Sequence, residues 1–567
     1  MQRKTRYPLA IMHLKGTEVE MGRQYGEMLL EMGGYQEVLD FYPTMAETML
    51  LQGFPREMRK SWLTRLGKPL LDWGLNSLNN QRPEQFSLRT SEALRAGKIA
   101  PDLARFINVM DLFQNSVATV SRLGMVRKRS HYVPQFLPAC STAMVWGEAS
   151  KDGQLMHARN FDFPGLGIWD EAPCVVFCTP ADGIPFGYVS ARGAEVPGVS
   201  CFNEEGITIT FHTRLNQDVG FDGIGAVDLG HTIIKNAKTL DEAVKIAGVF
   251  KIASTWGIAI SSAKEKRSIV IETTRKGISV IEPQYPEAQV NTNHYYSEQH
   301  KNNEIATSST FAQHSYSREQ RMCQIIEAAQ PQGGCTVTDM QQMLGDNREH
   351  EGELRAMGST LAQLISVMSM VVKPEASKLF LSAGQAPTGW GPYAEVDLQY
   401  GQEPGLHIVE VDGTSNHHYV TESKKNQAYQ HYRAAALADL NEHNTELVNS
   451  YIGQAIDLDA KEPSYRFLAG ALALETGNFS QARLHFEEGL SNETSGFRQG
   501  QFQYWLGRLA LQQGRTSEAR ARLQSLQDLN HAFLAAEVTT LQKEINAGRP
   551  SKDLKSIIPN FMLIDAA

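Results

Sequence analysis

The stretch that decides the fold is Cys140-Ser-Thr-Ala-Met-Val-Trp-Gly-Glu-Ala-Ser-Lys-Asp-Gly-Gln-Leu-Met-His-Ala-Arg-Asn-Phe-Asp162. It predicts a β-hairpin, because two strand-like runs flank the turn sequence Lys-Asp-Gly. A thiol begins the first strand, and Arg159 and Asp162 lie near the end of the second. A hairpin brings its two ends together, so these three groups are expected to share one small volume. A cysteine beside a guanidinium and a carboxylate is a candidate nucleophile.

Length and composition indicate a globular chain of several domains. Its 567 residues exceed one ordinary core, and 42% are hydrophobic and 21% charged. The net charge of -9 comes without a basic block, which argues against nucleic acid as a partner. The apolar run after Arg3-Lys-Thr-Arg is too short for a signal peptide or a membrane span. We therefore expect a cytoplasmic protein, or a secreted one if a leader has been removed.

The six cysteines are sparse for this length. Cys174 and Cys178 lie in an alternating segment that predicts a strand, where they are interpreted as small buried hydrophobic residues. Because the sequence has no paired CxxC elements, we expect no structural zinc, and we predict neither a metal nor a cofactor.

The sequence divides into four segments with different residue patterns. Residues 1–139 are mainly helical in pattern, 140–424 form the candidate catalytic core, 425–545 are helical, and 546–567 form a tail. Strand patterns occur at 141–147, 154–162, 199–212, 256–262, 268–274 and 277–283, and helical patterns at 225–236, at 240–250 and from 317 onward. Runs of strands followed by helices predict an α+β fold.

The segment from 425 repeats itself. Gly470, Gly477, Ala482 and Phe486 recur 37 residues later as Gly507, Gly514, Ala519 and Leu523. A weaker copy precedes the first, and over about 430–528 the pattern resembles the tetratricopeptide repeat. The resemblance implies a surface for a protein partner or for self-association, although such repeats also serve only to cover a catalytic domain. A generic helical bundle is the alternative.

The hairpin is the first of four motifs that occur in the order found in a known family. Cys140-Ser, Lys151-Asp-Gly and Ala158-Arg-Asn-Phe-Asp are followed by Phe202-Asn-Glu-Glu-Gly-Ile, Val290-Asn-Thr-Asn-His and Ser317-Arg-Glu-Gln-Arg. Together they resemble the choloylglycine hydrolase and penicillin acyltransferase group of N-terminal-nucleophile hydrolases (peptidase C45-like), over residues 140 to about 400. Gly16-Thr-Glu-Val-Glu-Met-Gly-Arg-Gln-Tyr-Gly also resembles the front segment of the acyltransferase-like members. The resemblance implies a four-layer αββα core.

Members of this group are cut just before the cysteine, here at the Ala139-Cys140 bond. The new α-amino group has an unperturbed pKa of about 7.7 to 8.0, so it serves as the base for its own thiol. Two prolines, Pro134 and Pro138, keep the approach to this bond extended. Residues 1–139 are then expected to remain as a separate, retained chain.

The resemblance also implies the site residues. Cys140 attacks an acyl carbonyl, Asp162 orients the α-ammonium, and Arg159 favours the thiolate. Asn293 donates to the oxyanion, and Arg318 completes the polar network. Asn291 is a possible error of register for Asn293, Arg321 is the fallback for Arg318, and Arg159 with Asp162 is alternatively a structural ion pair.

One position departs from the bile-salt-hydrolysing branch. Counting from Asn203 to the second oxyanion asparagine of that branch reaches Thr213, with His212 beside it. Thr213, His212 and Asn160 are therefore secondary candidates. A Cys-His pair drawn from His157, His212 or His294, or a zinc site built from these histidines, is the mechanistic competitor.

The sequence thus predicts an autoprocessed cysteine enzyme that hydrolyses or transfers the acyl group of a small non-peptide N-acyl amide. The rival is a degenerate scaffold whose repeats bind a protein partner.

Overall fold

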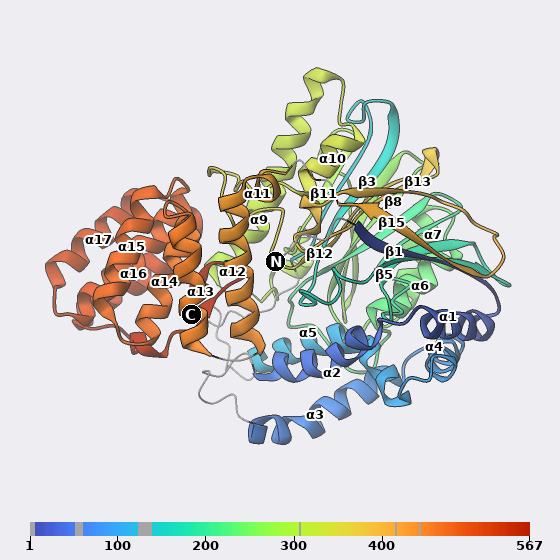
Figure 1. Ribbon diagram of the computed structural model, residues 1–567, viewed down its shortest axis with the longest axis horizontal. Coiled ribbons are helices and arrows are strands. Elements are labelled where there is room, and N and C mark those ends of the chain that lie inside the picture. The colour runs from blue at the N-terminus through green and yellow to red at the C-terminus, as the bar shows by residue number, and fades with distance from the viewer. Residues whose placement is uncertain are drawn as a thin grey trace.

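The computed structural model describes residues 6–51, 61–122, 139–305, 308–413, 415, 417–441 and 444–566. Two packed β-sheets with helices on their outer faces form the core, and a separate group of C-terminal helices lies beside it (Figure 1). The two prolines before Ala139 lie outside the described residues.

The larger sheet has nine strands in the order β10-β9-β8-β7-β6-β5-β4-β1-β15. Neighbouring strands are antiparallel except β1 and β4, which are parallel. The strands are β1 (Arg6–Gly16), β4 (Pro173–Pro180), β5 (Phe186–Ala191), β6 (Ser200–Asn203), β7 (Ile207–Thr213), β8 (Trp256–Ser262), β9 (Arg267–Thr274), β10 (Gly277–Ile281) and β15 (Gly405–Asp412).

The smaller sheet contains the predicted hairpin. Its order is β11-β2-β3-β12-β13-β14, and all its neighbours are antiparallel. In the hairpin, β2 pairs with β3 and Gly147 lies opposite Gly153 across the turn. The strands are β2 (Ser141–Gly147), β3 (Gly153–Asp162), β11 (Ala288–Asn291), β12 (Ser366–Lys373), β13 (Lys378–Ser382) and β14 (Tyr393–Asp397).

The two sheets meet through side chains of β2, β3, β7, β8 and β9. Met144 and Leu155 of the smaller sheet pack with Ala259 and Val270 of the larger one. Polar pairs cross the same layer, since the His157 ring bonds Thr210 Oγ1 at 3.0 Å and Ser261 Oγ at 2.8 Å. The layer is therefore a true interface between sheets.

Helices cover both outer faces, which confirms the predicted αββα fold. Apolar residues of α1 (Glu18–Met32), α4 (Glu84–Ala96), α6 (Ala226–Asn236) and α7 (Leu240–Val249) pack on the nine-stranded sheet. Those of α9 (Ser309–Ala329) and α10 (Val337–Leu344) pack on the six-stranded sheet. The remaining core helices are α2 (Gln36–Leu51), α3 (Ser61–Asn79), η2 (Pro101–Asn108), α5 (Val109–Arg122) and α8 (Glu298–Lys301).

Several elements differ from the sequence prediction, which did not include strands β5 and β11 to β15. The N-terminal segment, predicted as mainly helical, begins with strand β1, whose partner strands lie far along the chain. Helix α9 begins at Ser309 rather than near 317, because the Ser308 side chain caps it by accepting from Phe311 N at 3.0 Å. Arg318 consequently lies within the helix rather than in its first turn.

The C-terminal helices occur in antiparallel pairs, as the internal repeat predicted. A Cβ on Gly470 would lie 2.4 Å from the Phe486 ring, so glycine allows the two helices of that pair to approach closely. Identification with the tetratricopeptide family stays a prediction. The helices are α11 (His418–Thr421), α12 (Ser423–Asn441), α13 (Thr445–Leu458), α14 (Pro463–Glu475), α15 (Phe479–Asn492), α16 (Gly496–Gln512), α17 (Thr516–Asp528) and α18 (Ala535–Ala547).

The chain ends in a short hairpin of β16 (Pro559–Asn560) and β17 (Asp565–Ala566). In the described part of the chain, no helix has the length and apolar character needed to cross a membrane.

Candidate active site

Cys140 immediately precedes β2 and is 2% exposed. Its Sγ lies 3.6 Å from Arg159 Nη2 and 4.0 Å from the backbone oxygen of Asp162. Burial raises the pKa of the thiol above its ordinary value, and this effect outweighs the opposing influence of the Arg159 guanidinium. In the uncut chain the sulfur is therefore held as a neutral thiol.

Arg159 connects the thiol to the opposite sheet. Its Nη1 donates to Val199 O and Ser200 Oγ, each at 2.5 Å, and its Nη2 donates to Phe211 O at 2.6 Å. The guanidinium also lies 4.8 Å from the centre of the Phe161 ring. Contacts from both sheets thus fix the cation beside Cys140.

Asp162 is fully buried at the end of β3. Its Oδ1 accepts from Ser366 Oγ at 2.5 Å, whereas Oδ2 has no hydrogen-bond partner among the described residues. Burial raises the pKa of this carboxyl to about 7, even though Arg318, Ser366 and Arg159 favour the charged form. The free oxygen is a ready acceptor for a new donor.

The raised pKa of Asp162 makes the stability of the uncut chain depend on pH. Between pH 4 and about pH 7 the folded state keeps a proton that the unfolded state has released, so stability falls as pH rises through this window. In an uncut Cys140→Ala background, Asp162→Asn should raise the thermal midpoint more at pH 8 than at pH 5, because most of the penalty accumulates above pH 5. Thermal unfolding at both pH values measures this, and an equal shift at both would contradict the assignment.

Arg318 lies at the opposite side of the nucleophile, on α9, and is fully buried. Its Nη1 lies 2.7 Å from Ala139 O, 2.8 Å from Cys140 O and 2.7 Å from Ser141 Oγ. Burial lowers its pKa to about 10, so the group stays charged at neutral pH. The guanidinium is therefore within hydrogen-bond distance of the carbonyl oxygens of Ala139 and Cys140, the two residues joined by the bond predicted to be cut.

Asn293 is oriented by Arg318. Its Oδ1 accepts from Arg318 Nη2 at 2.8 Å, and its Nδ2 donates to Thr213 O at 3.0 Å. The register alternative, Asn291, instead accepts from Arg214 Nη2 at 2.8 Å. Arg321, the fallback for Arg318, pairs with Asp346 at 2.7 Å. The structure thus brings Asn293 and Arg318 together beside Cys140, and directs Asn291 and Arg321 elsewhere.

The three secondary candidates lie in different places, and not all of them reach the site. Thr213 lines the cavity described below. Asn160 donates to Leu344 O at 2.8 Å and Leu361 O at 2.9 Å, so its amide holds the end of α10 and a loop rather than the site. His212 bonds the backbone oxygen of Cys140 at 3.3 Å and Thr142 Oγ1 at 2.8 Å.

The alternative mechanism, a Cys-His pair, is not formed by this geometry. The His212 ring contacts the backbone of Cys140, and burial lowers its pKa well below the ordinary value. His157 bonds Thr210 and Ser261 at the sheet interface, and His294 Nε2 lies 3.1 Å from Glu319. In the described residues, no histidine ring nitrogen bonds the Cys140 sulfur.

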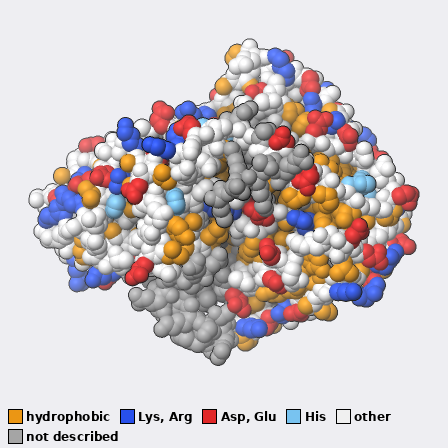
Figure 2. All heavy atoms as spheres, in the orientation of Figure 1, with side chains coloured by type: hydrophobic (Ala, Val, Ile, Leu, Met, Phe, Trp, Pro, Cys, Tyr) orange, Lys and Arg blue, Asp and Glu red, His pale blue; other side chains and the backbone are white. Residues whose placement is uncertain are grey.

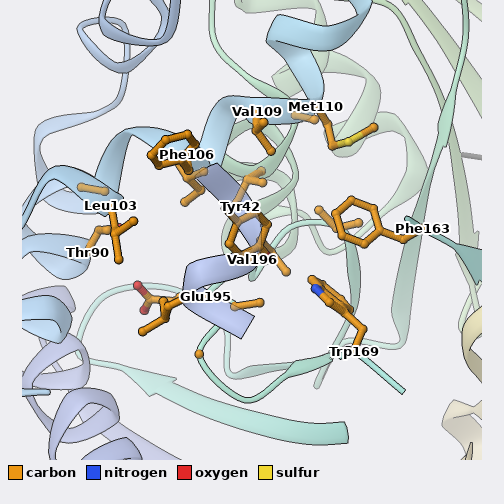
Figure 3. A pocket seen from close by; sticks show the side chains of 18 of the residues that line it. Tyr42, Thr90, Leu103, Phe106, Val109, Met110, Phe163, Trp169, Glu195 and Val196 are labelled. Carbon is orange, nitrogen blue, oxygen red and sulfur yellow. The ribbon is translucent and has the colours of Figure 1, made fainter. Parts of the chain in front are cut away.

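A cavity of about 1120 Å³, counting the part open to solvent, lies against Cys140. Its wall is mostly apolar, and about half of its lining residues precede Cys140 in the chain, from α1, α2, α4, η2 and α5. Figure 3 shows Phe163 and Trp169 at one end of this cavity in that view and Glu195 with Thr90 at the other. Phe161 packs 5.3 Å from both aromatic rings, so the thiol and Arg159 belong to the aromatic end.

Two carboxylates line this cavity. Asp111 accepts from Ala226 N at 3.2 Å and from Trp256 Nε1 at 3.0 Å. Glu195 accepts from Arg89 Nε at 2.5 Å through Oε1, while its Oε2 is buried without a partner among the described residues. Glu195 thus lines the far end of an apolar cavity and holds one buried acceptor without a partner among the described residues. Sequence reasoning missed it, because no motif surrounds it.

The comparison with known protein families concerns the chain that follows Cys140. The family model of acyl-coenzyme A:6-aminopenicillanic acid acyl-transferase matches residues 149–386, which is less than half of the chain and begins after Cys140. This match confirms the predicted resemblance of residues 149–386 to the acyltransferase-like group. No curated protein matches the chain in sequence.

Two solved structures are similar to parts of the chain. The Caenorhabditis elegans ortholog of N-acylethanolamine-hydrolyzing acid amidase is 13% identical, with a TM-score of 0.30, over 41% of this chain and 93% of its own. Penicillin V acylase from Agrobacterium tumefaciens is 15% identical, with a TM-score of 0.32, over 49% of this chain and 93% of its own. Similarities this low carry no argument about activity.

Proposed function

We propose that this chain cuts itself before Cys140 and then uses the new N-terminal cysteine to hydrolyse or transfer the acyl group of a non-peptide N-acyl amide. The observation that carries the proposal is the position of Cys140 at the wall of an apolar cavity, between Arg159 and Arg318.

Self-cleavage follows from the contacts of the uncut chain. The Cys140 thiol attacks the Ala139 carbonyl carbon, and Arg318 Nη1, 2.7 Å from the carbonyl oxygen, stabilises the developing negative charge. The bond from this carbon to the Cys140 nitrogen then breaks, and that nitrogen takes up the proton. Water hydrolyses the resulting thioester, which releases the Ala139 carboxylate and restores the thiol.

The cut supplies the base that the uncut site lacks. The new α-amine takes the proton of the Cys140 thiol, and the ammonium donates to the unpartnered Oδ2 of Asp162. That bond and the positive charge return the Asp162 carboxyl to its ionised form. The nucleophile is thus activated only after processing.

Turnover repeats the same chemistry on a bound amide. The thiolate attacks the acyl carbon, and the Asn293 amide, which Arg318 orients beside the Thr213 backbone, supplies a donor to the oxyanion. The amine leaves with the proton held by the α-ammonium, and water or another amine takes the acyl group from the thioester.

Residues 1–139 remain bound after the cut on this proposal. Strand β1 lies between β4 and β15, and buried ion pairs link Arg82 with Asp228 at 2.8 Å and Glu18 with Lys235 at 2.9 Å. This segment also forms about half of the cavity wall, so its loss would open the site.

The cavity defines the substrate class. Its apolar wall fits a hydrophobic acyl group, and Glu195 Oε2 fits a hydroxyl or ammonium donor on the part of the substrate away from the scissile bond. A donor that pairs with this buried oxygen removes the cost of leaving it unpartnered.

A panel of amides tests both parts of this proposal. Matched amides with an apolar acyl chain would carry a methyl, hydroxyl or ammonium end, placed either on the acyl chain or on the amine. We expect an acyl adduct on the Cys140 peptide by mass spectrometry, and kcat/KM roughly 10- to 100-fold higher for a donor-bearing amide than for its methyl analogue.

Glu195→Gln should reduce that preference while keeping the adduct, because the amide still accepts from Arg89. Thr90→Val is the matched control at the same end, since its Oγ1 already accepts from Arg82 at 3.1 Å. A preference that is unchanged in Glu195→Gln would refute the recognition role, and a missing adduct would refute the enzyme.

A further inference from the structure

The C-terminal helical domain, α12 to α18, contacts the catalytic core at several places, among them Asp170 with Arg433 and Thr310 with Gln501, and along one buried segment. This segment is Arg355–Ser366, called here the linking loop. Beside the core in Figure 1, the helices form a compact group that packs against it on one side. A single cluster of buried apolar residues continues from Phe163 through Ile365 to Tyr432. The two parts therefore share one core.

The first half of the linking loop is held by the helical domain. Arg355 pairs with Glu493 at 2.5 Å, Ala356 N donates to Glu462 at 2.8 Å, and Ser464 Oγ donates to Met357 O at 2.7 Å. These contacts come from α14 and from the residues before α14 and α16. Buried ionic groups of this kind hold a defined geometry only when each has its partner.

Arg498 of α16 binds the middle of the loop. Its Nη2 donates to Ser359 Oγ at 3.0 Å, and its Nε pairs with Glu349 of the core at 3.0 Å. Nη1 donates to the C-terminal tail, at Leu563 O and Ile564 O. This guanidinium thus joins the helical domain, the tail and the core at one point.

The middle and the end of the loop reach the candidate active site. Ser366 Oγ donates to Asp162 Oδ1 at 2.5 Å. Ser359 accepts from Ser317 Oγ at 3.2 Å through its backbone oxygen and bonds Gln313 through its hydroxyl. Gln313 and Ser317 lie on α9, and Ser317 directly precedes Arg318. The loop therefore contacts Asp162 directly and the α9 turn that carries Arg318 through Gln313 and Ser317.

We propose that the helical domain is a positioning module for the nucleophile. By holding the linking loop through Arg498, it fixes Asp162 and the α9 turn that carries Arg318. The inference rests on the proposed function for its kinetic readout.

A matched pair of arginines on α16 tests the proposal. Arg498 and Arg508 are both buried and both pair with a glutamate at 3.0 Å, but Arg508 pairs with Glu544 inside the helical domain. We expect Arg498→Met to raise hydrogen exchange in peptides that cover 355–366 and 313–318, and to lower the rate of self-cleavage and kcat by about 10²-fold with KM little changed.

Arg508→Met should lower the melting temperature of the full chain without these two effects. Arg498→Lys should restore part of the rate, because it keeps the charge beside Glu349 but not the planar fork. Equal exchange and equal rates in Arg498→Met and Arg508→Met would overturn the proposal. If the wild type neither cuts itself nor turns over an amide, the proposed function fails, while the exchange data still decide whether Arg498 orders the loop.

Discussion

Replacing Cys140 by alanine should leave one uncut polypeptide of 63.0 kDa, whereas the wild type separates on a denaturing gel into residues 1–139 and 140–567. The reason is that the Cys140 sulfur is the only nucleophile that the proposed cleavage uses. Amide turnover should fall by about 10⁶-fold, the size of effect found when a catalytic nucleophile is removed.

Intact mass and N-terminal sequencing of the larger fragment measure the result. Denaturing conditions are required, because strand β1 and the buried ion pairs hold the fragments together. Cys335→Ala is the matched control, since Cys335 is also a buried free cysteine but packs in the outer layer beneath α9 and α10. The hypothesis is contradicted if the wild type stays uncut and its Cys140 does not react with a thiol-directed acylating reagent.

Arg318→Met should slow self-cleavage by about 10²- to 10³-fold, the cost of losing one donor to an oxyanion. The guanidinium lies on Ala139 O and also holds the Asn293 amide, so both the cleavage and the later turnover lose stabilisation. Pulse–chase synthesis of the precursor, followed by denaturing electrophoresis, gives the rate directly.

Arg321→Met controls for loss of an arginine on the same helix, because Arg321 pairs with Asp346 away from the thiol. Arg318→Lys keeps a charged donor, so it should recover part of the rate if the variant fails for electrostatic reasons rather than by misfolding. Cleavage at the wild-type rate in Arg318→Met would remove this residue from the mechanism.

Local pattern predicted much of the fold. The hairpin, the strands β4 and β6 to β10 and the paired C-terminal helices appear where periodicity and turn residues indicated them, whereas β5 and β11 to β15 were not predicted. Strand β1 was missed because its pairing partners, β4 and β15, are distant in the chain, and its residues are buried on both faces instead of alternating. Helix α9 begins earlier than predicted because Ser308 provides the cap, upstream of the Ser317-Arg318 motif.

The candidate site shows the same division. Motif order identified Cys140, Arg159, Asp162, Asn293 and Arg318 as candidates. In the structure Arg159 and Asp162 contact the Cys140 sulfur, and Arg318 joins Asn293 to the Cys140 backbone. The sequence offered no signal for Glu195, whose significance comes only from an oxygen left without a partner at the end of the cavity. The same holds for Arg498, which reaches the site through the linking loop.

The sequence by itself determined the hairpin, its thiol and the order of the polar motifs, because strand alternation and turn chemistry act between near neighbours. Only the tertiary structure decided that the N-terminal helices wall the cavity, that Arg318 lies on the Ala139 carbonyl, and that the helical domain holds the linking loop. These contacts join residues more than 100 positions apart, and packing of the whole core brings them together, which no local period encodes.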